Sequence, residues 1–261
     1  MLLLVWKHRN LLVELTKREF SAKYMGSAGG VLWAFLQPLF LLAVYTTAFG
    51  VILKARWGGS GSATEYAMML FAGLIVFNAF SEVMIKSPVL ITANPNFVKK
   101  IVFPLELLPV VTVLSALLQA CISVMIWLLG YTLFFGPPFM SVILFPVVLI
   151  LFAPVLLGIG WLFSAVGVLF RDVGQISGML AHVTLFLTPI FYSVDTAPAF
   201  IRKALLFNPL TFVVDELRAV LFLGHGLSSL WCLAYFAGAC LFAWFALRSF
   251  KLLRPVFADL V

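Results

Sequence analysis

The chain has 261 residues, of which 64% are hydrophobic and only 10% are charged, so an ordinary water-soluble fold could not bury its apolar surface. The net charge of +7 could suggest nucleic-acid binding, but the Lys and Arg residues lie at the ends of apolar segments and form no single basic face. The three cysteines form no CxxC pair, which argues against a zinc site or a disulfide framework. We therefore expect one all-α integral membrane domain over residues 1–261, with membrane lipids and not nucleic acid as partners.

Residues 1–25 predict a helix that lies at the membrane surface. The apolar run 1–6 is followed at once by charged residues, so it is too short for the ~7–15-residue apolar core of a signal peptide. Polar residues such as Glu14 and Lys17 then recur at three- and four-residue steps, while Leu11, Leu12 and Leu15 occupy another face. This pattern is typical of an amphipathic interface helix.

Six apolar segments follow, each near or above the ~20 residues that cross a bilayer as a helix. They cover residues 29–53, 66–85, 105–135, 140–170, 173–192 and 227–247. Pro38 and Pro154 predict bends in the first and fourth segments. Gly174 and Gly178 have a spacing that lets helices approach closely, although such matches are common by chance. The sequence thus predicts six transmembrane helices.

Lys and Arg accumulate in cytoplasmic loops, so the cations on alternate sides of these segments predict the orientation. The side that carries both ends of the chain holds twelve of the 17: Lys7, Arg9, Lys17, Arg18, Lys23, Lys86, Lys99, Lys100, Arg171, Arg248, Lys251 and Arg254. The other side holds five: Lys54, Arg56, Arg202, Lys203 and Arg218. We therefore expect a multi-pass protein with both termini in the cytoplasm.

Two of the connections contain more than a turn. The cytoplasmic stretch 87–103 has Asn94 and Pro95 as helix-start residues and keeps Phe97 apolar, which predicts a short surface helix that docks on a partner. The outer stretch 195–223 has two helix starts, one at Pro198 and one where Asn208 precedes Pro209. We expect two short re-entrant helices at the outer mouth, before the last span.

The sequence contains no motif for holding a nucleotide. A P-loop needs a glycine-rich turn that ends in Gly-Lys-Ser/Thr, whereas the only Lys-Ser pair, Lys86-Ser87, follows Ile85. The glycine- and serine-rich run 58–62 has no lysine and predicts a flexible loop. We therefore expect no catalytic residue, no metal site and no cofactor on this chain.

Few ionisable residues fall within the apolar segments, and each has a structural interpretation beside a functional one. Glu82 lies four residues before Lys86, so an ion pair is favoured over a transport carboxylate. His182 could relay protons, but a hydrogen-bonded core histidine is the favoured interpretation. Glu106 and Asp172 lie at inner helix ends, where either a neighbouring cation or a partner protein could contact them. The lack of a mid-span carboxylate pair argues against a proton-coupled pump.

Aromatic residues of the first and fifth segments could form a surface over which a sugar polymer slides, because aromatic faces attract the polarised C–H groups of sugars. The residues are Trp33, Phe40, Tyr45, Phe186, Phe191 and Tyr192. For any single aromatic residue, contact with lipid or with a neighbouring helix is the favoured alternative.

Four segments, in this order, resemble the ABC-2 permeases. They are KREFSAKYMGSAGGVLWAFLQPLF, NPNFVKKIVFPLELLP, LFRDVGQISG and TPIFYSVDTAPAFIRKALLFNPLTFVVDELRAVLF. Within that family the chain is similar to the transmembrane subunits of bacterial O-antigen, capsule and teichoic-acid exporters. The resemblance implies a homodimer of six-helix subunits with two copies of a cytoplasmic ABC ATPase, which binds ATP and Mg²⁺. The implied cargo is an undecaprenyl-diphosphate-linked polysaccharide that crosses the inner membrane.

The resemblance also implies roles for three groups of residues. The coupling helix on the ATPase would comprise Asn94, Pro95, Asn96, Phe97, Lys99 and Lys100. The periplasmic gate helices would include Pro198, Arg202, Asn208, Pro209, Asp215 and Arg218. Four cations of the interface helix could contact the lipid diphosphate or, alternatively, anionic headgroups: Arg9, Lys17, Arg18 and Lys23. An exporter of a drug or of another lipid, and an ion-coupled transporter or membrane enzyme, are the alternatives.

Overall fold

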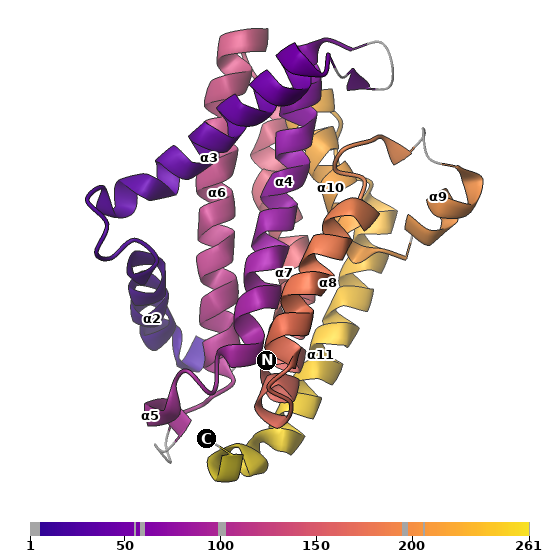
Figure 1. The fold of residues 1–261 in the computed structure, drawn as a ribbon. Coiled ribbons are helices and arrows are strands. Elements are labelled where there is room, and N and C mark those ends of the chain that lie inside the picture. The colour runs from indigo at the N-terminus through magenta and orange to yellow at the C-terminus, as the bar shows by residue number, and fades with distance from the viewer. Residues whose placement is uncertain are drawn as a thin grey trace.

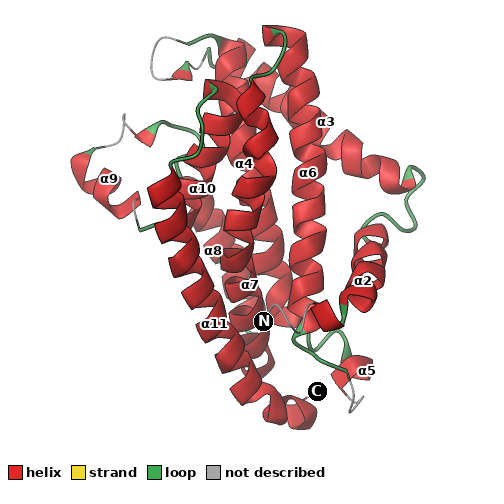
Figure 2. Cartoon of the chain, turned by 180° about the vertical axis from the view of Figure 1, so that it is seen from behind, coloured by secondary structure: helices red, strands yellow, loops and turns green. Residues whose placement is uncertain are grey.

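The computed structural model describes residues 6–54, 56–57, 61–98, 103–194, 198–205 and 207–260, and the regular elements in these ranges are helices (Figures 1 and 2). In chain order they are α2 (Arg9–Ala22), η1 (Gly30–Leu32), α3 (Trp33–Tyr45), η2 (Thr46–Ile52), α4 (Ala63–Lys86), η4 (Ser87–Val89), α5 (Pro95–Val98), α6 (Leu107–Phe135), η5 (Met140–Leu144), α7 (Phe145–Leu169), α8 (Val173–Leu187), α9 (Ala199–Leu205), α10 (Pro209–Arg218), η7 (Ala219–Leu223) and α11 (Ser229–Leu260). The predicted all-α class is confirmed.

Five helical stretches in the described ranges are long and apolar enough to cross a membrane. They are Gly30–Phe49, Ala63–Val89, Leu107–Phe135, Met140–Leu169 and Ser229–Phe257, and the apolar helix α8 is shorter. The predicted fifth segment extends to Tyr192, but α8 ends at Leu187. The cause is Pro189, because a residue before proline avoids the α conformation and Thr188 is accordingly extended.

Helix α4 forms the centre of the bundle and packs against α3, α6, α7, α8 and α10. Its first turn is closed by a capping box, in which Ser62 accepts from the Glu65 amide and Glu65 accepts from the Ser62 amide. The helix is apolar on nearly every side, so burial against several neighbours is the arrangement that suits it. Two buried indoles also find backbone acceptors: Trp127 Nε1 donates to Met68 O, and Trp161 Nε1 donates to Glu106 O.

Helix α3 crosses the bundle obliquely, as both ribbon views show (Figures 1 and 2). Only Ala34, Pro38 and Leu42 of this helix are buried, and their four-residue spacing places them on one stripe toward the rest of the bundle. Beyond Tyr45 the backbone continues as the π-helical stretch η2. Apart from Gln37, the exposed residues of α3 are apolar, which suits contact with lipid or with another chain.

Two glycines of α7 allow other segments to approach the backbone closely. A Cβ at Gly167 would lie 2.1 Å from Pro88 O of η4, and a Cβ at Gly158 would lie 2.4 Å from the Phe242 ring of α11. In contrast, a Cβ at Gly178 would meet nothing within 4 Å, and one at Gly174 would make an ordinary contact. The close approaches therefore occur at α7 and not at the Gly174 and Gly178 pair that the spacing suggested.

Replacing Gly167 by alanine should destabilise the protein, because the neighbouring Pro88 O is backbone and cannot rotate away. We expect a loss of about 1–3 kcal/mol, which is the usual range for overpacking, and a lower thermal midpoint of the detergent-purified chain. Gly178→Ala is the control, since its methyl group has open space and alanine favours a helix. Equal midpoints for both variants would contradict this account of the α7–η4 contact.

Candidate transport pathway and partner surface

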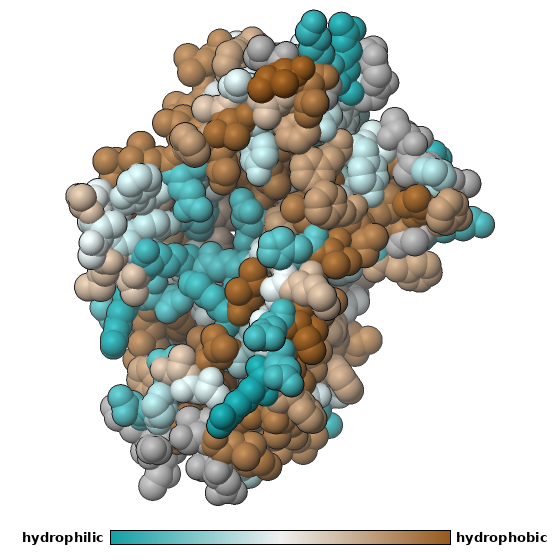
Figure 3. Space-filling model, viewed as in Figure 1, coloured by the Kyte–Doolittle hydropathy of each residue, from teal (hydrophilic) through white to brown (hydrophobic). Residues whose placement is uncertain are grey.

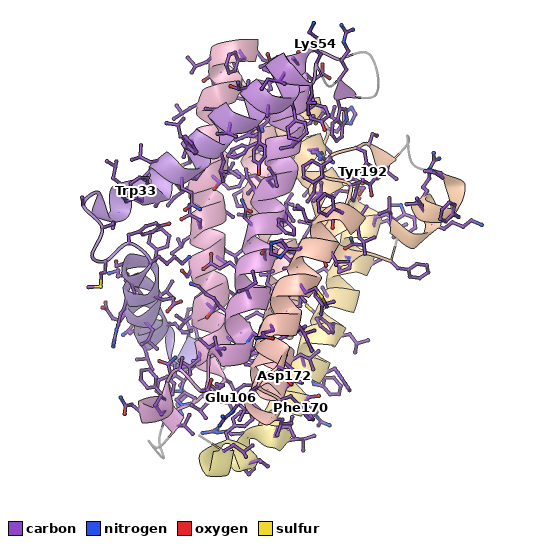
Figure 4. The ribbon with its side chains drawn as sticks, viewed as in Figure 1. Trp33, Lys54, Glu106, Phe170, Asp172 and Tyr192 are labelled. Carbon is purple, nitrogen blue, oxygen red and sulfur yellow. The ribbon has the colours of Figure 1, made fainter. Side chains whose placement is uncertain are left out.

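Aromatic side chains gather near the Lys54 end of the bundle, which is the upper end in Figure 4. Phe49 lies at their centre, with ring centroids 6.1 Å from Tyr45, 5.6 Å from Tyr66 and 6.0 Å from Phe191. Phe186 stacks on Phe191 at 5.8 Å. The Tyr66 hydroxyl donates to Phe191 O at 2.7 Å, which holds the turn after α8 against α4.

The structure brings together four of the six aromatic residues that the sequence suggested: Tyr45, Phe186, Phe191 and Tyr192. Trp33 and Phe40 lie apart from them on exposed faces of α3, and Figure 4 shows Trp33 at the far end of that helix from Tyr192. Phe49 and Tyr66 were missed by the sequence analysis. The four-residue step from Tyr45 to Phe49 is a signal that could have found the first of these.

Arg218 is buried at the end of α10, where its guanidinium donates to three backbone carbonyls. Nε donates to Met69 O at 3.0 Å, Nη1 to Pro189 O at 2.7 Å, and Nη2 to Ile190 O at 2.9 Å. The guanidinium also lies over the Trp57 ring, with 4.4 Å from Cζ to the centroid. These bonds join α10 to α4 and to the turn that follows α8.

The residues around Arg218 accommodate its charged side chain. A Cβ at Gly73 would lie only 2.9 Å from Nη2, so the glycine makes room for the guanidinium. Burial lowers the pKa of Arg218 to about 10, while Asp215, 3.9 Å away, acts in the opposite direction, so the group remains charged at neutral pH. The positive-inside count treats Arg218 as an outer cation, but its side chain lies inside the protein.

Replacing Arg218 by methionine should strongly destabilise the fold, because the carbonyls of Pro189 and Ile190 would lose this donor at about 1–3 kcal/mol each and Met69 O would lose one of its bonds. The measurement is the thermal midpoint of the detergent-purified chain. Arg56→Met is the control, since Arg56 is exposed on the connection before α4. A midpoint for Arg218→Met equal to that of the control would show that the buried guanidinium does not hold these segments together.

Ion pairs near the other end of α4 connect it to the N-terminal helix. Glu82 Oε1 lies 2.6 Å from Lys23 Nζ and 3.0 Å from Lys86 Nζ, and Lys86 Nζ lies 3.3 Å from Glu19 Oε1. The predicted pair of Glu82 and Lys86 is confirmed, with Lys23 and Glu19 as additional members. Burial lowers the pKa of Lys23 and the carboxylate of Glu82 opposes that shift.

The four cations expected to contact a diphosphate or lipid headgroups occupy different environments. Lys17 is exposed and pairs loosely with Glu14 at 3.8 Å, and the Arg9 guanidinium lies over the Trp6 ring. Arg18 is exposed at the rim of a small cavity that α2 shares with the loop before α5. Lys23, which follows α2, is instead held by Glu82, so the exposed members of this group are the three on α2 itself.

The predicted docking segment forms the short helix α5 at the lower end of the molecule (Figure 1). It begins at Pro95, and the Asn94 side chain donates to Leu90 O at 2.9 Å. Phe97 stacks on Phe103 with ring centroids 4.4 Å apart, which attaches α5 to the start of α6. Asn96 is exposed. Lys99 and Lys100, also expected here, lie outside the described residues.

Glu106 links this segment to the last helix. Its carboxylate is buried and lies 3.1 Å from Arg254 Nη1 of α11, while Arg254 Nη2 donates to Phe103 O at 3.2 Å. Of the two possibilities that the sequence left open for Glu106, the described structure supplies a cation, which is Arg254 of α11. Asp172 lies near the same end, at the start of α8 (Figure 4).

The exposed His182 ring lies 2.7 Å from Gly178 O of its own helix, so it is hydrogen-bonded but is not a core residue.

The two helices expected before the last span are present. Pro198 precedes α9 and its carbonyl accepts from the Arg202 amide, and α9 projects sideways from the bundle (Figure 1). Asn208 caps α10 by accepting from the Leu210 amide at 3.0 Å, with Pro209 in the first turn. In contrast to α9, α10 packs against α4 and α7, and the Asp215 side chain is half exposed.

The geometry is a bundle of apolar helices long enough to span a membrane, with the short helix α5 at one end and an aromatic cluster at the other. The family model for the ABC-2 type transporter matches residues 10–222, which is most of the chain. The chain therefore belongs to the ABC-2 type transporter family, as the resemblance of its segments predicts, and is a multi-pass membrane permease.

Several curated relatives cover most of the chain. The O-antigen export system permease protein RfbA of Myxococcus xanthus is 28% identical over 258 residues, which cover 98% of this chain and 96% of that protein. A protein of the same name from Klebsiella pneumoniae is 24% identical over 254 residues, with 97% and 95% covered. The polysialic acid transport protein KpsM of Escherichia coli is 27% identical over 213 residues, with 80% of each chain covered.

Proposed function

We propose that this chain is the permease subunit of an ATP-driven exporter that moves an undecaprenyl-diphosphate-linked, O-antigen-like polysaccharide across the bacterial inner membrane. The observation that carries the proposal is the similarity to O-antigen export permeases along nearly the whole of both chains. The family membership and the apolar helices support an inner-membrane location. In this proposal both termini are cytoplasmic, because the side with both ends carries most of the cations.

The working unit in this proposal is a homodimer with two copies of a cytoplasmic ABC ATPase, which binds ATP and Mg²⁺. The contact on this chain is α5 with the residues around it, from Asn94 to Lys100. Support comes from the exposure of Asn96 and from the stack of Phe97 on Phe103. A force applied to α5 would reach α11 through Phe103 and Glu106, which Arg254 contacts together.

The path for the glycan lies between the two subunits in this proposal. Exposed apolar faces of α3 and α8 support such an interface, since Phe40 and Phe186 are both more than two-thirds exposed in the single chain. The aromatic cluster around Phe49 offers ring faces to sugars without a deep pocket. The helices α9 and α10 would gate the outer mouth, with Arg218 as the fixed point of α10.

A capsular polysaccharide is the second candidate cargo, favoured by the similarity to a polysialic acid transport protein. That comparison covers a smaller share of both chains than the comparison with the O-antigen permeases. Teichoic acid, another lipid and a drug are further alternatives within the same family. The chemistry of the glycan retained in a deletion strain would separate the saccharide cargoes from the others.

Deleting the gene should abolish the surface glycan and leave lipid-linked polymer inside the cell. The measurement is surface staining of the glycan together with extraction of the lipid-linked fraction, and the intact gene supplied from a plasmid is the control. Normal surface glycan in the deletion strain would contradict the proposed function. Loss of a secreted drug or lipid with unchanged glycan would favour the alternative cargoes.

Replacing Phe97 by alanine should weaken attachment of the ATPase, because α5 loses the ring contact that positions it. Aromatic pairs contribute roughly 0.5–1.5 kcal/mol, so about a two- to tenfold lower yield of co-purified ATPase is expected. Phe134→Ala is the control, since Phe134 is an exposed phenylalanine in the last turn of α6, at the opposite end from α5. Equal yields from both variants, at equal permease abundance, would contradict the assignment of α5.

A further inference from the structure

A half-open cavity of about 430 Å³, with both polar and apolar side chains in its wall, lies between α3, α4 and α6. Its walls include Gln37 of α3, Asn78 and Ser81 of α4, and Gln119 of α6. Glu82 and its two lysine partners form the end of the cavity toward α2. Figure 3 shows hydrophilic residues gathered in the angle between α3 and α6, with hydrophobic surface above and below.

The position of these polar side chains is not suited to contact with lipid. Gln37 and Asn78 lie within the stretches Gly30–Phe49 and Ala63–Val89, which are long and apolar enough to span a membrane. Both side chains are exposed, and neither they nor Ser81 bonds to another of the described residues. An amide in hydrocarbon without a partner costs about 4–8 kcal/mol, so these groups require water, a ligand or a neighbouring chain.

The charges around the cavity balance one another. Lys23 and Lys86 face Glu82, and Lys86 also faces Glu19, so two lysines meet two carboxylates. A phosphate or diphosphate is bound best by cations that are not already paired. The cavity therefore lacks the uncompensated positive charge that an anionic group would require.

The neutral groups offer hydrogen bonds to a ligand with many hydroxyls. Gln119 is held in place, since it accepts from the Tyr24 hydroxyl at 2.7 Å and donates to Ala34 O at 2.9 Å. The amides of Gln37 and Asn78 can each donate and accept, and the Ser81 hydroxyl can do both. Sugar hydroxyls have the same dual character, so they match the groups that are open in this cavity.

We propose that this cavity binds a neutral, hydroxyl-rich segment of the cargo, which is a saccharide and not the lipid diphosphate. This inference rests on the proposed function for the identity of the cargo. Asn78 and Gln37 are the residues that hydrogen-bond the sugar, and the cavity is filled with water when no cargo is present. The aromatic cluster at the Lys54 end is then a separate site, which the cargo contacts after the cavity.

Water access is tested by cysteine labelling in permeabilised cells, with Cys121, Cys232 and Cys240 replaced by alanine. A positively charged methanethiosulfonate reagent should label Ser81→Cys rapidly, because Ser81 lines the cavity and its replacement leaves both binding amides in place. Leu241→Cys is the control, because Leu241 is an exposed apolar residue in the middle of α11. Labelling of Ser81→Cys no faster than that of Leu241→Cys would show that water does not enter the cavity and would overturn the proposal.

The occupant is tested by comparing three cell types: one that makes the full lipid-linked glycan, one that stops after the first sugar, and one that makes none. The full glycan should slow the labelling of Ser81→Cys about fivefold, which is the result expected when the glycan occupies roughly four-fifths of the cavities. Equal labelling rates in all three cell types would overturn the proposal. Full protection by the one-sugar lipid would identify the lipid head as the occupant and would overturn it too.

A measurement of glycan export distinguishes failure of the cavity proposal from failure of the proposed function. Asn78→Leu should lower surface glycan about fivefold at unchanged permease abundance, with partial recovery in Asn78→Ser. Asn10→Leu is the matched control, since Asn10 is an exposed amide on α2, away from the cavity. If gene deletion abolishes export but Asn78→Leu does not lower it, only the cavity proposal fails. If deletion leaves export intact, the proposed function itself fails.

Discussion

Polar groups within a membrane protein must find partners in the protein or in water, and this constraint orders the structure. The Arg218 guanidinium meets it with three backbone carbonyls, and the indoles of Trp127 and Trp161 meet it with one carbonyl each. Each of these bonds joins elements that are distant in the chain. The same requirement applies to Gln37 and Asn78, and the proposed saccharide, or water in its absence, would satisfy it.

Helix α4 contains polar groups that satisfy this constraint at both ends of the bundle. Near its start, Tyr66 and the carbonyl of Met69 hold the aromatic cluster and Arg218 in place. Near its end, Glu82 and Lys86 bind the N-terminal helix. Under the proposed function, a movement at the cytoplasmic end would therefore reach the aromatic end through one rigid, buried helix.

The apolar pattern predicted the helices well, because length and local hydrophobicity decide whether a segment can cross a bilayer. The cap at Asn208 and the pair of Glu82 and Lys86 were also predictable, since both depend on residues within four positions of one another. The early end of α8 was missed, although Pro189 was a visible signal for it. Trp33 and Phe40 were grouped with the other aromatic residues on composition alone, and the structure separates them.

Local spacing therefore determined the helical class, the short helix α5 and the two helices before the last span, because these depend on neighbouring residues. Tertiary packing alone decided that Arg218 is buried, that Lys23 pairs with Glu82, and that Gln37 and Asn78 share a cavity. Each of these arrangements brings together residues tens of positions apart in the chain. The apolar periodicity of a helix does not predict which of its faces will contact another helix. The chemistry proposed for the cavity depends on these contacts. The ion pairs that neutralise its lysines form only once α2 and α4 are packed together.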